Sequence, residues 1–332
     1  MREVVAPIDI AHPDGRLQRD AVGWARHPFH RAGLPRVSRV ARWNYWCIAN
    51  RACALTLLVA DVGFAGVVLV SFLDYAARGP VERVALSPRG LPFTLGDTPQ
   101  DDLFVDTKRL ALEMRTTNGV MQVTGAARTI LGKNIEIDLA ITRPPTHETL
   151  NVLVPWDETR FQFTSKQQAL PVRGVVRVDG RAHVFGDEND SYACLDFGRG
   201  RYPRGIEWNW GFASGRCSGR VIGMNLGGKW TDGTGVNENG FVVDGRLQKI
   251  HDDVDFAEER SGRWTIRTRA SSRVELTFSP LRERSVRVPL GLASVRLRQM
   301  MGSFTGTLEA DDGEKLQVAD IFGLAEWLRA RW

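Results

Sequence analysis

Short segments in which apolar and polar residues alternate recur along this chain of 332 residues. Successive side chains of a β-strand point to opposite faces, so a period of two predicts strands with one buried face. The segments that show this pattern best are 133–142, 148–155, 160–165, 172–180, 263–268 and 273–280. The pattern predicts an all-β protein built from antiparallel strands.

Turn signals separate many of these segments. Asx-Gly pairs tolerate the positive φ angles that two-residue β-turns require. We expect hairpins at Asn118-Gly119, Asp179-Gly180, Asp244-Gly245 and Asp312-Gly313. Many hairpin-connected strands indicate a sandwich or a barrel.

The apolar stretch 52–73 is long enough to cross a membrane as a helix. Its one charge, Asp61, lies near the middle, where it would cost roughly 2.5–3.5 kcal/mol in a bilayer. Asp61 and Gly63 also provide a turn between two β-branched runs. We therefore predict two buried strands in a hairpin rather than a membrane span, and we leave peripheral contact with a membrane open.

Helical periodicity is scarce, and the clearest case is the C-terminal segment 318–332. Apolar residues there follow the spacing of one helical face. They are Ile321, Leu324, Ala325 and Leu328. We predict a C-terminal amphipathic helix packed on a sheet, whereas the pattern at 98–114 is ambiguous.

The chain is too long for one small barrel, so we expect two linked lipocalin-like β-barrel or sandwich units. Residues 1–40 have little periodicity and are interpreted as an irregular N-terminal arm. The Pro-rich stretch 143–147 divides the remainder. We therefore predict a first β unit at 41–145 and a second at 146–332, which carries the C-terminal helix.

The composition, 43% hydrophobic and 25% charged, is typical of a folded globular protein. A net charge of +5 comes from basic residues scattered among acidic ones, without a basic run interleaved with aromatic residues. We therefore expect no nucleic-acid partner. The N-terminus has no signal-peptide pattern, and the cysteines lack metal-site spacing. We expect reduced, buried thiols and a cytoplasmic protein; the cysteines are Cys47, Cys53, Cys194 and Cys217.

The stretch GMNLGGKWTDGTGVNENG, residues 223–240, begins with the glycine and lysine spacing of a phosphate-binding loop. Trp230 stands where Ser or Thr should hold magnesium, and a helix-breaking sequence follows. The oxygen-rich residues from Asp232 to Asn239 could bind calcium, but the EF-hand spacing is absent. We predict neither a nucleotide loop nor a metal site here.

A third interpretation of this stretch is a pocket. Antiparallel pairing could bring 207–215, 221–228 and 237–245 side by side, with acids and amides between indole rings. A carboxyl group in an aromatic lining can donate a proton near neutral pH. The plain alternative is that the amides and acids satisfy turns and the Trp residues fill the core.

We predict Glu238 or Asp232 as the proton donor, with Glu207 and Asp196 in reserve. The predicted substrate-binding residues are Tyr202, Trp208, Asn209, Trp210, Asn225, Trp230, Asn237 and Asn239. On another segment, Trp43, Tyr45 and Cys47 share one strand face and are expected to line the core or a barrel.

Several blocks of the sequence together resemble a large bacterial family classed as a domain of unknown function. They are GWARHP, RWNYWCI, DFGRGRYPRGIEWNWGFASG, IGMNLGGKWTDGTGVNENG, VDGRLQKI and GLAEWLRARW. More distantly, the chain is similar to lipocalin-like two-domain proteins such as carotenoid 1,2-hydratase, tocopherol cyclase and Diels–Alderases. In the hydratases and cyclases, the resemblance implies an acid that protonates a double bond inside an apolar barrel. It assigns no catalytic residue to this chain.

We therefore expect an apolar or isoprenoid-like small molecule to bind in the pocket and to be hydrated, isomerised or cyclised without a cofactor. One alternative is a non-catalytic lipid-binding or carrier protein. Another is a carbohydrate-active protein, because Trp platforms with paired carboxylates also suit sugars.

Overall fold

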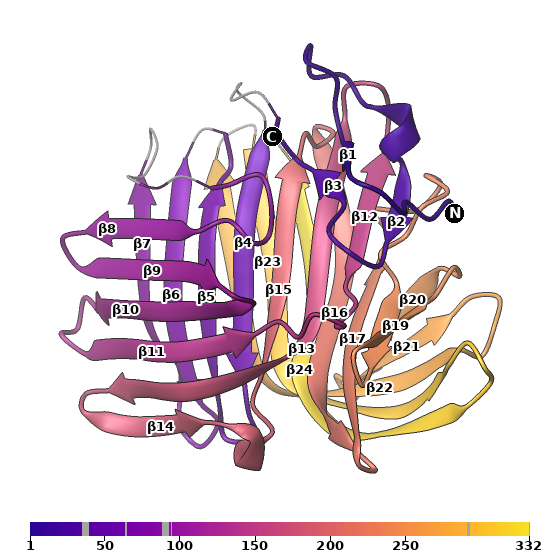
Figure 1. Cartoon of the computed structure of the whole chain (residues 1–332). Helices are drawn as coiled ribbons and strands as arrows, with labels where there is room; N and C mark the ends of the chain where they lie inside the picture. Colours follow the sequence, from indigo (N-terminus) through magenta and orange to yellow (C-terminus); the bar gives the residue numbers. More distant parts are fainter. Residues whose placement is uncertain (35–39, 64, 88–92, 94, 291–292, 332) are drawn as a thin grey trace.

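The computed structural model describes residues 1–332 except 35–39, 64, 88–92, 94, 291–292 and 332. Within these residues the regular structure is almost entirely β, arranged in a small parallel pair and two large sheets (Figure 1). The small pair joins β1 (Ile8–Asp9) to β3 (His30–Arg31). Two short 3-10 helices are described, η1 (Arg19–Ala21) and η2 (Asp187–Asn189).

The first large sheet has 13 strands, and its main path runs β7-β6-β5-β4-β15-β13-β11-β10-β9-β8. Strand β12 joins β13 to β2, and β14 also pairs with β13. The strands are β2 (Gly23–Ala25), β4 (Ala41–Ala49), β5 (Cys53–Asp61), β6 (Gly66–Asp74), β7 (Val81–Ser87), β8 (Leu103–Thr107), β9 (Leu110–Thr117), β10 (Val120–Arg128), β11 (Asn134–Thr142), β12 (Leu150–Pro155), β13 (Phe161–Val178), β14 (Arg181–Phe185) and β15 (Tyr192–Gly200).

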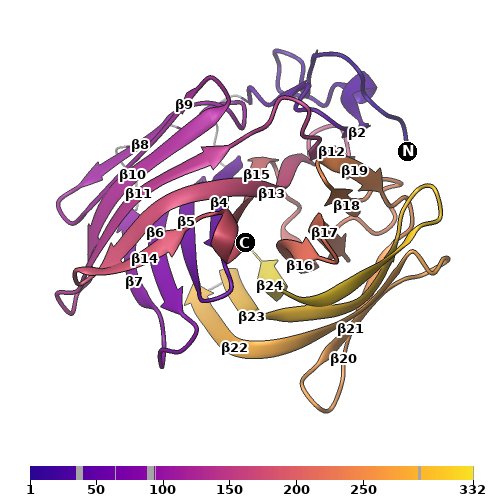
Figure 2. The same ribbon diagram turned by 60° about the horizontal axis from the view of Figure 1, so that its bottom comes forward.

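The second large sheet has nine strands in the order β19-β18-β17-β16-β24-β23-β22-β21-β20. Its strands are β16 (Gly205–Cys217), β17 (Arg220–Gly228), β18 (Gly240–Val243), β19 (Arg246–Lys249), β20 (Val254–Glu258), β21 (Trp264–Thr268), β22 (Val274–Leu290), β23 (Ala293–Glu309) and β24 (Lys315–Arg331). Both large sheets curl into half-barrels, as Figure 2 shows. The predicted all-β architecture of two linked units is thus confirmed.

The alternating sequence pattern explains the first half-barrel. Strands β8–β11 cross β4–β7 in Figure 1, and the apolar residues of both groups meet in one core. For example, Leu112 and Val123 from one group share this core with Leu55 and Val70 from the other. The stretch 52–73 forms the β5–β6 hairpin, with Asp61 opposite Gly66, as predicted.

Three of the four expected Asx-Gly turns place both residues at positive φ, as two-residue hairpins require. The first residues of these turns are Asn118, Asp179 and Asp244, with φ angles of 51°, 49° and 47°. Local turn chemistry therefore sets these hairpins.

The predicted C-terminal helix is wrong, because residues 315–331 form β24 at the centre of the second sheet. Ile321 and Ala325 belong to the core of the second half-barrel, whereas Leu324 packs toward the first sheet. Asp320 has a φ of 55° at a bulge that places Val318 and Ile321 on one face. Because β24 is buried on both faces and contains this bulge, the apolar residues of 318–328 have the same spacing in the sequence as one face of a helix.

The segments 160–165 and 172–180, expected as separate strands, form the single long strand β13. A bulge between Gln167 and Leu170, with Ala169 at φ 57°, bends it. The first sheet extends to Gly200 and the second begins at Gly205. The expected division at 145/146 falls between β11 and β12 of the first sheet.

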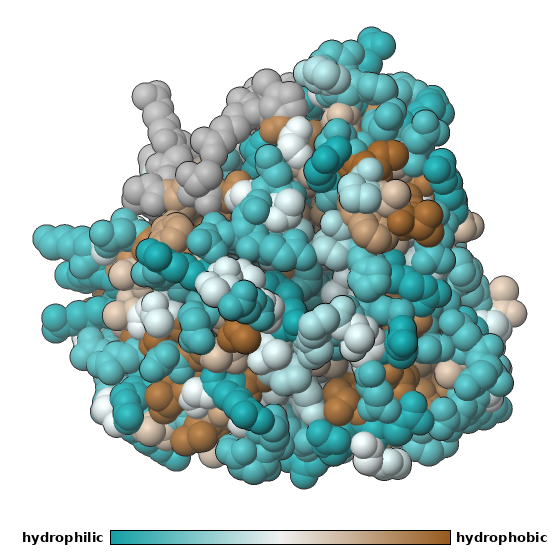
Figure 3. All heavy atoms as spheres, viewed as in Figure 1, coloured by the Kyte–Doolittle hydropathy of each residue, from teal (hydrophilic) through white to brown (hydrophobic). Residues whose placement is uncertain are grey.

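In the part of the chain that the structure describes, no helix is long and apolar enough to span a membrane. The face seen in Figure 3 is mainly hydrophilic, with separate small hydrophobic areas.

Candidate functional site

The two half-barrels pack against each other through β13 and β15 on one side and β16 and β17 on the other. A mixed aromatic and aliphatic layer fills this interface. It includes Tyr45 and Cys47, as the shared strand face of 41–51 predicted, and Trp210, Phe212 and Leu324 from the second sheet.

A charged cluster lies buried beside this layer. Lys166 on β13 and Asp196 on β15 are register partners, and Lys166 Nζ lies 2.9 Å from Asp196 Oδ1. Lys166 Nζ also lies 3.2 Å from Glu238 Oε2, in the loop before β18. The exposed fractions of these side chains are 5% for Lys166, 12% for Asp196 and 2% for Glu238. We call these three residues the charged cluster.

The charged cluster holds two carboxyl groups and one ammonium group. Burial lowers the pKa of Lys166, but the charges of Asp196 and Glu238 outweigh this effect and leave the pKa raised. Burial raises the pKa of Glu238, although Lys166 opposes the shift. One cation cannot fully neutralise two acids in a low-dielectric interior. Glu238 is therefore the group best placed to retain a proton.

The glycine-rich stretch that resembles a phosphate loop makes room for this carboxyl group. Gly223–Gly228 belong to β17, and no helix follows them among the described residues. A Cβ atom at Gly227 would overlap Glu238 Oε1. A Cβ atom at Gly223 would meet Gln168 and Ala169 of β13 at 2.7–2.8 Å. Gly227 therefore makes room for the Glu238 side chain, and Gly223 is required by the close approach of β17 to β13.

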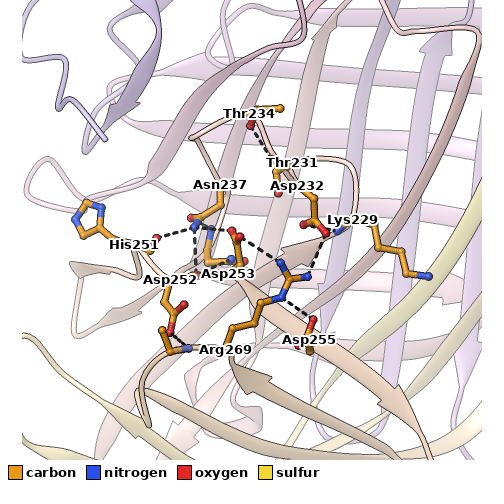
Figure 4. Close-up of polar contacts among 12 residues, drawn as sticks. Lys229, Thr231, Asp232, Thr234, Asn237, His251, Asp252, Asp253, Asp255 and Arg269 are labelled. Atoms are coloured by element: carbon orange, nitrogen blue, oxygen red, sulfur yellow. Dashed lines mark hydrogen bonds and ion pairs between the residues drawn. The ribbon is translucent and has the colours of Figure 1, made fainter.

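Alternation along 237–239 aims Glu238 and the two flanking amides in opposite directions. Glu238 accepts a hydrogen bond from Trp230 Nε1 at 2.8 Å. Asn237 and Asn239 instead donate to backbone carbonyls at 251–252, and part of this arrangement is visible in Figure 4. Lys249 Nζ donates to Asn237 Oδ1, Asn239 O and Ile250 O at 2.6–2.8 Å. Asn237 and Asn239 therefore hold the loop and do not face the cluster.

Four partly buried aromatic rings lie on the Glu238 side of the cluster, and we call them the aromatic cover: Trp43, Trp156, Tyr202 and Trp230. Ring centroids lie 5.9 Å apart for Trp43–Tyr202, 5.4 Å for Trp156–Tyr202 and 5.9 Å for Trp156–Trp230. Burial raises the pKa of Tyr202, and the charges of Asp196 and Glu238 add to the shift. The cover thus lies within electrostatic reach of both carboxyl groups.

Trp210 and its neighbours form the opposite wall of the site. Lys166 Nζ lies 4.6 Å from the centroid of the Trp210 ring, a cation–π contact. Trp210 Nε1 donates to Asn225 Oδ1, and Asn225 in turn donates to the Glu238 carbonyl. The predicted residues Asp196, Trp210, Asn225, Trp230 and Glu238 are thus brought together.

A third buried carboxyl group, Glu326 on β24, lies next to this wall. It accepts hydrogen bonds from Trp208 Nε1 and Gln299 Nε2, each at 2.8 Å. Burial raises the pKa of Glu326, and the charge of Asp196 contributes to the shift. The predicted residue Trp208 therefore donates a hydrogen bond to a carboxyl group whose raised pKa favours its protonated form.

Two of the predicted acids lie outside the cluster. Glu207 is half-buried, forms ion pairs with Lys229 and Arg329, and accepts from Trp327 Nε1 at 3.0 Å. Asp232 pairs with Arg269 at 3.1 Å on the exposed side of the second half-barrel (Figure 4). Asn209 is buried within β16.

Sequence reasoning missed Lys166, Trp156, Lys249 and Glu326. A usable signal existed for Lys166, because the polar run Thr164-Ser165-Lys166-Gln167-Gln168 interrupts an apolar strand. All five of these residues are buried. A polar run that remains buried in a sheet indicates a second packed face rather than a loop.

A cleft with a volume of about 740 Å³ lies elsewhere along the interface between the sheets. Tyr75 and Phe322, stacked with centroids 4.1 Å apart, line it, as do Arg51, Asp190 and Arg216. The predicted site residues do not line this cleft. Ser214 lines this cleft, and its Oγ lies 3.1 Å from Cys194 Sγ. Cys194 belongs to the aromatic and aliphatic layer between the half-barrels.

The four cysteines are buried and free, as expected. Burial raises the pKa of Cys194 to about 12 and that of Cys53 also to about 12. These thiols are therefore poor nucleophiles.

Comparisons with known proteins found a family and distant structures. The sequence model of a family described as "Domain of unknown function (DUF2804)" matches residues 1–332. The curated proteins contain no match. Among solved structures, CghA is 10% identical, with a TM-score of 0.45 and 88% of each chain covered. Kievitone hydratase from Nectria haematococca is also 10% identical, with a TM-score of 0.44 and 88% of each chain covered.

Proposed function

We propose that this chain, which belongs to the DUF2804 family of domains of unknown function, binds an apolar small molecule at the aromatic cover and acts on it by acid–base chemistry. The observation that carries this proposal is the charged cluster, in which Glu238 is 2% exposed and shares one cation with Asp196. An ion cluster of this kind is a poor way to stabilise a fold, because desolvation offsets much of its Coulomb energy. Function is therefore the better explanation for it.

In the proposed reaction, the Glu238 carboxyl group donates its proton to one carbon of a substrate double bond. The cation formed at the other carbon lies against the indole faces of the cover, which stabilise positive charge. Addition of water completes a hydration, and loss of a neighbouring proton completes an isomerisation. Attack by a second double bond of the substrate, followed by proton loss, completes a cyclisation. In each case a proton returns to the cluster, so the site needs no cofactor.

Native mass spectrometry of protein purified from cells tests this proposal. If Glu238 is the proton donor, Glu238→Gln should retain substrate, whereas wild type should carry product or no ligand. The matched control Glu207→Gln should behave as wild type, because Glu207 lies outside the cluster. A product that differs from the retained substrate by one water indicates hydration, and equal masses indicate isomerisation or cyclisation.

The alternative is a carrier that binds the same class of ligand without changing it. The aromatic cover suits a carrier equally well. This alternative predicts the same ligand in wild type and in Glu238→Gln. A Trp156→Ala substitution opens the cover and should weaken retention under both proposals, so unchanged retention would exclude the cover as the binding site.

A further inference from the structure

Three turns of the first half-barrel form one rim: residues 107–110, 128–134 and 178–181, which we call the basic rim. These turns follow β8, β10 and β13 and lie on the same side of the molecule, on the left in Figure 1. Backbone hydrogen bonds connect them, from Arg128 N to Arg109 O at 2.9 Å and from Asp179 N to Asn134 O at 3.0 Å. The rim is therefore a single surface.

Two large aliphatic side chains project from the middle turn of the rim. Ile130 is 79% exposed and Leu131 is 90% exposed, and they are adjacent in the sequence. Other exposed large hydrophobic residues of the chain, such as Val5 and Leu86, are not neighbours of these two in the sequence. Full exposure of two neighbouring aliphatic side chains at a hairpin tip contributes nothing to the stability of the fold.

Basic residues surround this apolar tip. The basic rim contains five basic residues and one acid, a net charge of +4; the basic residues are Lys108, Arg109, Arg128, Lys133 and Arg181. Arg181 lies 3.5 Å from Asp74. The other four have no ion pair with the described residues, and the acid, Asp179, accepts from Asn134 N. The positive charge of the rim is thus largely unneutralised.

We propose that the basic rim docks on the surface of an anionic lipid bilayer. Ile130 and Leu131 would insert at the level of the headgroups, and the surrounding Lys and Arg residues would attract anionic headgroups. The combination of an apolar tip with a positive collar favours a bilayer, because a protein partner would more often require a broader apolar patch. This proposal is independent of the reaction proposed for the charged cluster.

Vesicle co-sedimentation tests it directly with the full chain. Wild type should sediment with phosphatidylcholine vesicles that contain roughly a third phosphatidylserine, and much less with pure phosphatidylcholine. Added salt should weaken this binding, because it screens exposed charges. Equal partition into both kinds of vesicle, or none into either, would overturn the proposal.

Two double variants separate the contributions of the tip and the collar. Ile130→Ser with Leu131→Ser should weaken partitioning about tenfold or more. Arg128→Gln with Lys133→Gln should weaken it about 25-fold. These four positions are exposed or lie in a turn, so the melting temperature should not change.

Matched controls change equivalent groups elsewhere. Val5→Ser with Leu86→Ser removes exposed aliphatic side chains outside the rim. Arg260→Gln with Arg267→Gln removes two exposed charges from the second half-barrel. Both controls should sediment as wild type. If the two rim variants also sediment as wild type, another surface is responsible for any binding.

Discussion

Lys166 and Lys249 are both buried, but their amino groups face different kinds of partner. Lys166 faces the carboxylates of Asp196 and Glu238. Lys249 faces three neutral oxygens, and burial lowers its pKa well below the ordinary value. Those three acceptors match the three N–H groups of an ammonium ion.

This difference assigns a structural role to Lys249 and a role in the proposed chemistry to Lys166. Lys249 fixes the loop at 237–239 through hydrogen bonds to neutral oxygens, and Glu238 acts on it through charge without a direct ion pair. Lys166 leaves an excess of acid in the interior, because Asp196, Glu238 and Glu326 outnumber it. A buried excess of acid can be relieved only by taking up protons.

The largest expected effect follows from Lys166→Met, which leaves two buried carboxyl groups without their cation. We expect the free energy of unfolding at neutral pH to fall by about 3–5 kcal/mol. Chemical denaturation measures it. Adding Glu238→Gln should recover part of this loss, and a double variant no more stable than Lys166→Met alone would show that the two charges are not coupled.

Lys249→Met should cost less, about 2–3 kcal/mol, because it removes hydrogen bonds to neutral oxygens. The same denaturation experiment measures it. Here Glu238→Gln should recover little, in contrast to its effect on Lys166→Met. Equal recovery in both backgrounds would remove the distinction between the two lysines.

The pH dependence of stability tests whether Glu326 contributes to the buried excess of acid. Because burial raises its pKa in the folded state, the folded chain binds this proton more tightly than the unfolded chain does. Its contribution to stability is therefore favourable at low pH and is lost as pH rises from the ordinary value of 4.5 through the folded pKa. Glu326→Gln should reduce this loss in thermal unfolding between acidic and neutral pH. An unchanged pH profile would place the titration elsewhere.

The smallest effect is expected for Glu207→Gln, since Glu207 is half-buried and its partners reach solvent. Its free energy of unfolding should stay within about 1 kcal/mol of wild type. A loss as large as that of Lys166→Met would mean that Glu207 belongs to the buried network.

Local patterns in the sequence predicted most of the fold. Alternation and Asx-Gly turns identified the strands, and the charge of Asp61 favoured a hairpin over a membrane helix. The C-terminal helix failed because β24 is buried on both faces and bulges at Asp320, so its period is no longer two. Period alone cannot identify a strand packed between a barrel core and a second sheet.

The candidate site was predicted in part. Aromatic residues around acids indicated the group that includes Glu238, Trp230, Trp210 and Asn225. Lys166 could not be assigned to it, because its pairing with Asp196 depends on the β13–β15 register across 30 residues of chain. Alternation along 237–239 predicts that Glu238 points away from Asn237 and Asn239, as the structure has it. The hydrogen bonds of the two amides to the carbonyls at 251–252 depend on a neighbouring loop, which the sequence pattern does not place.

Infrared difference spectroscopy of wild type against Glu238→Gln tests the central claim most directly. If Glu238 retains a proton within the charged cluster, the difference spectrum near neutral pH should contain the carbonyl band of one protonated carboxyl group that wild type has and the variant lacks. The contribution of Glu326, which both proteins share, cancels in this difference. A difference spectrum in which wild type has only an additional ionised carboxylate would contradict the claim that this interior stores a proton for catalysis.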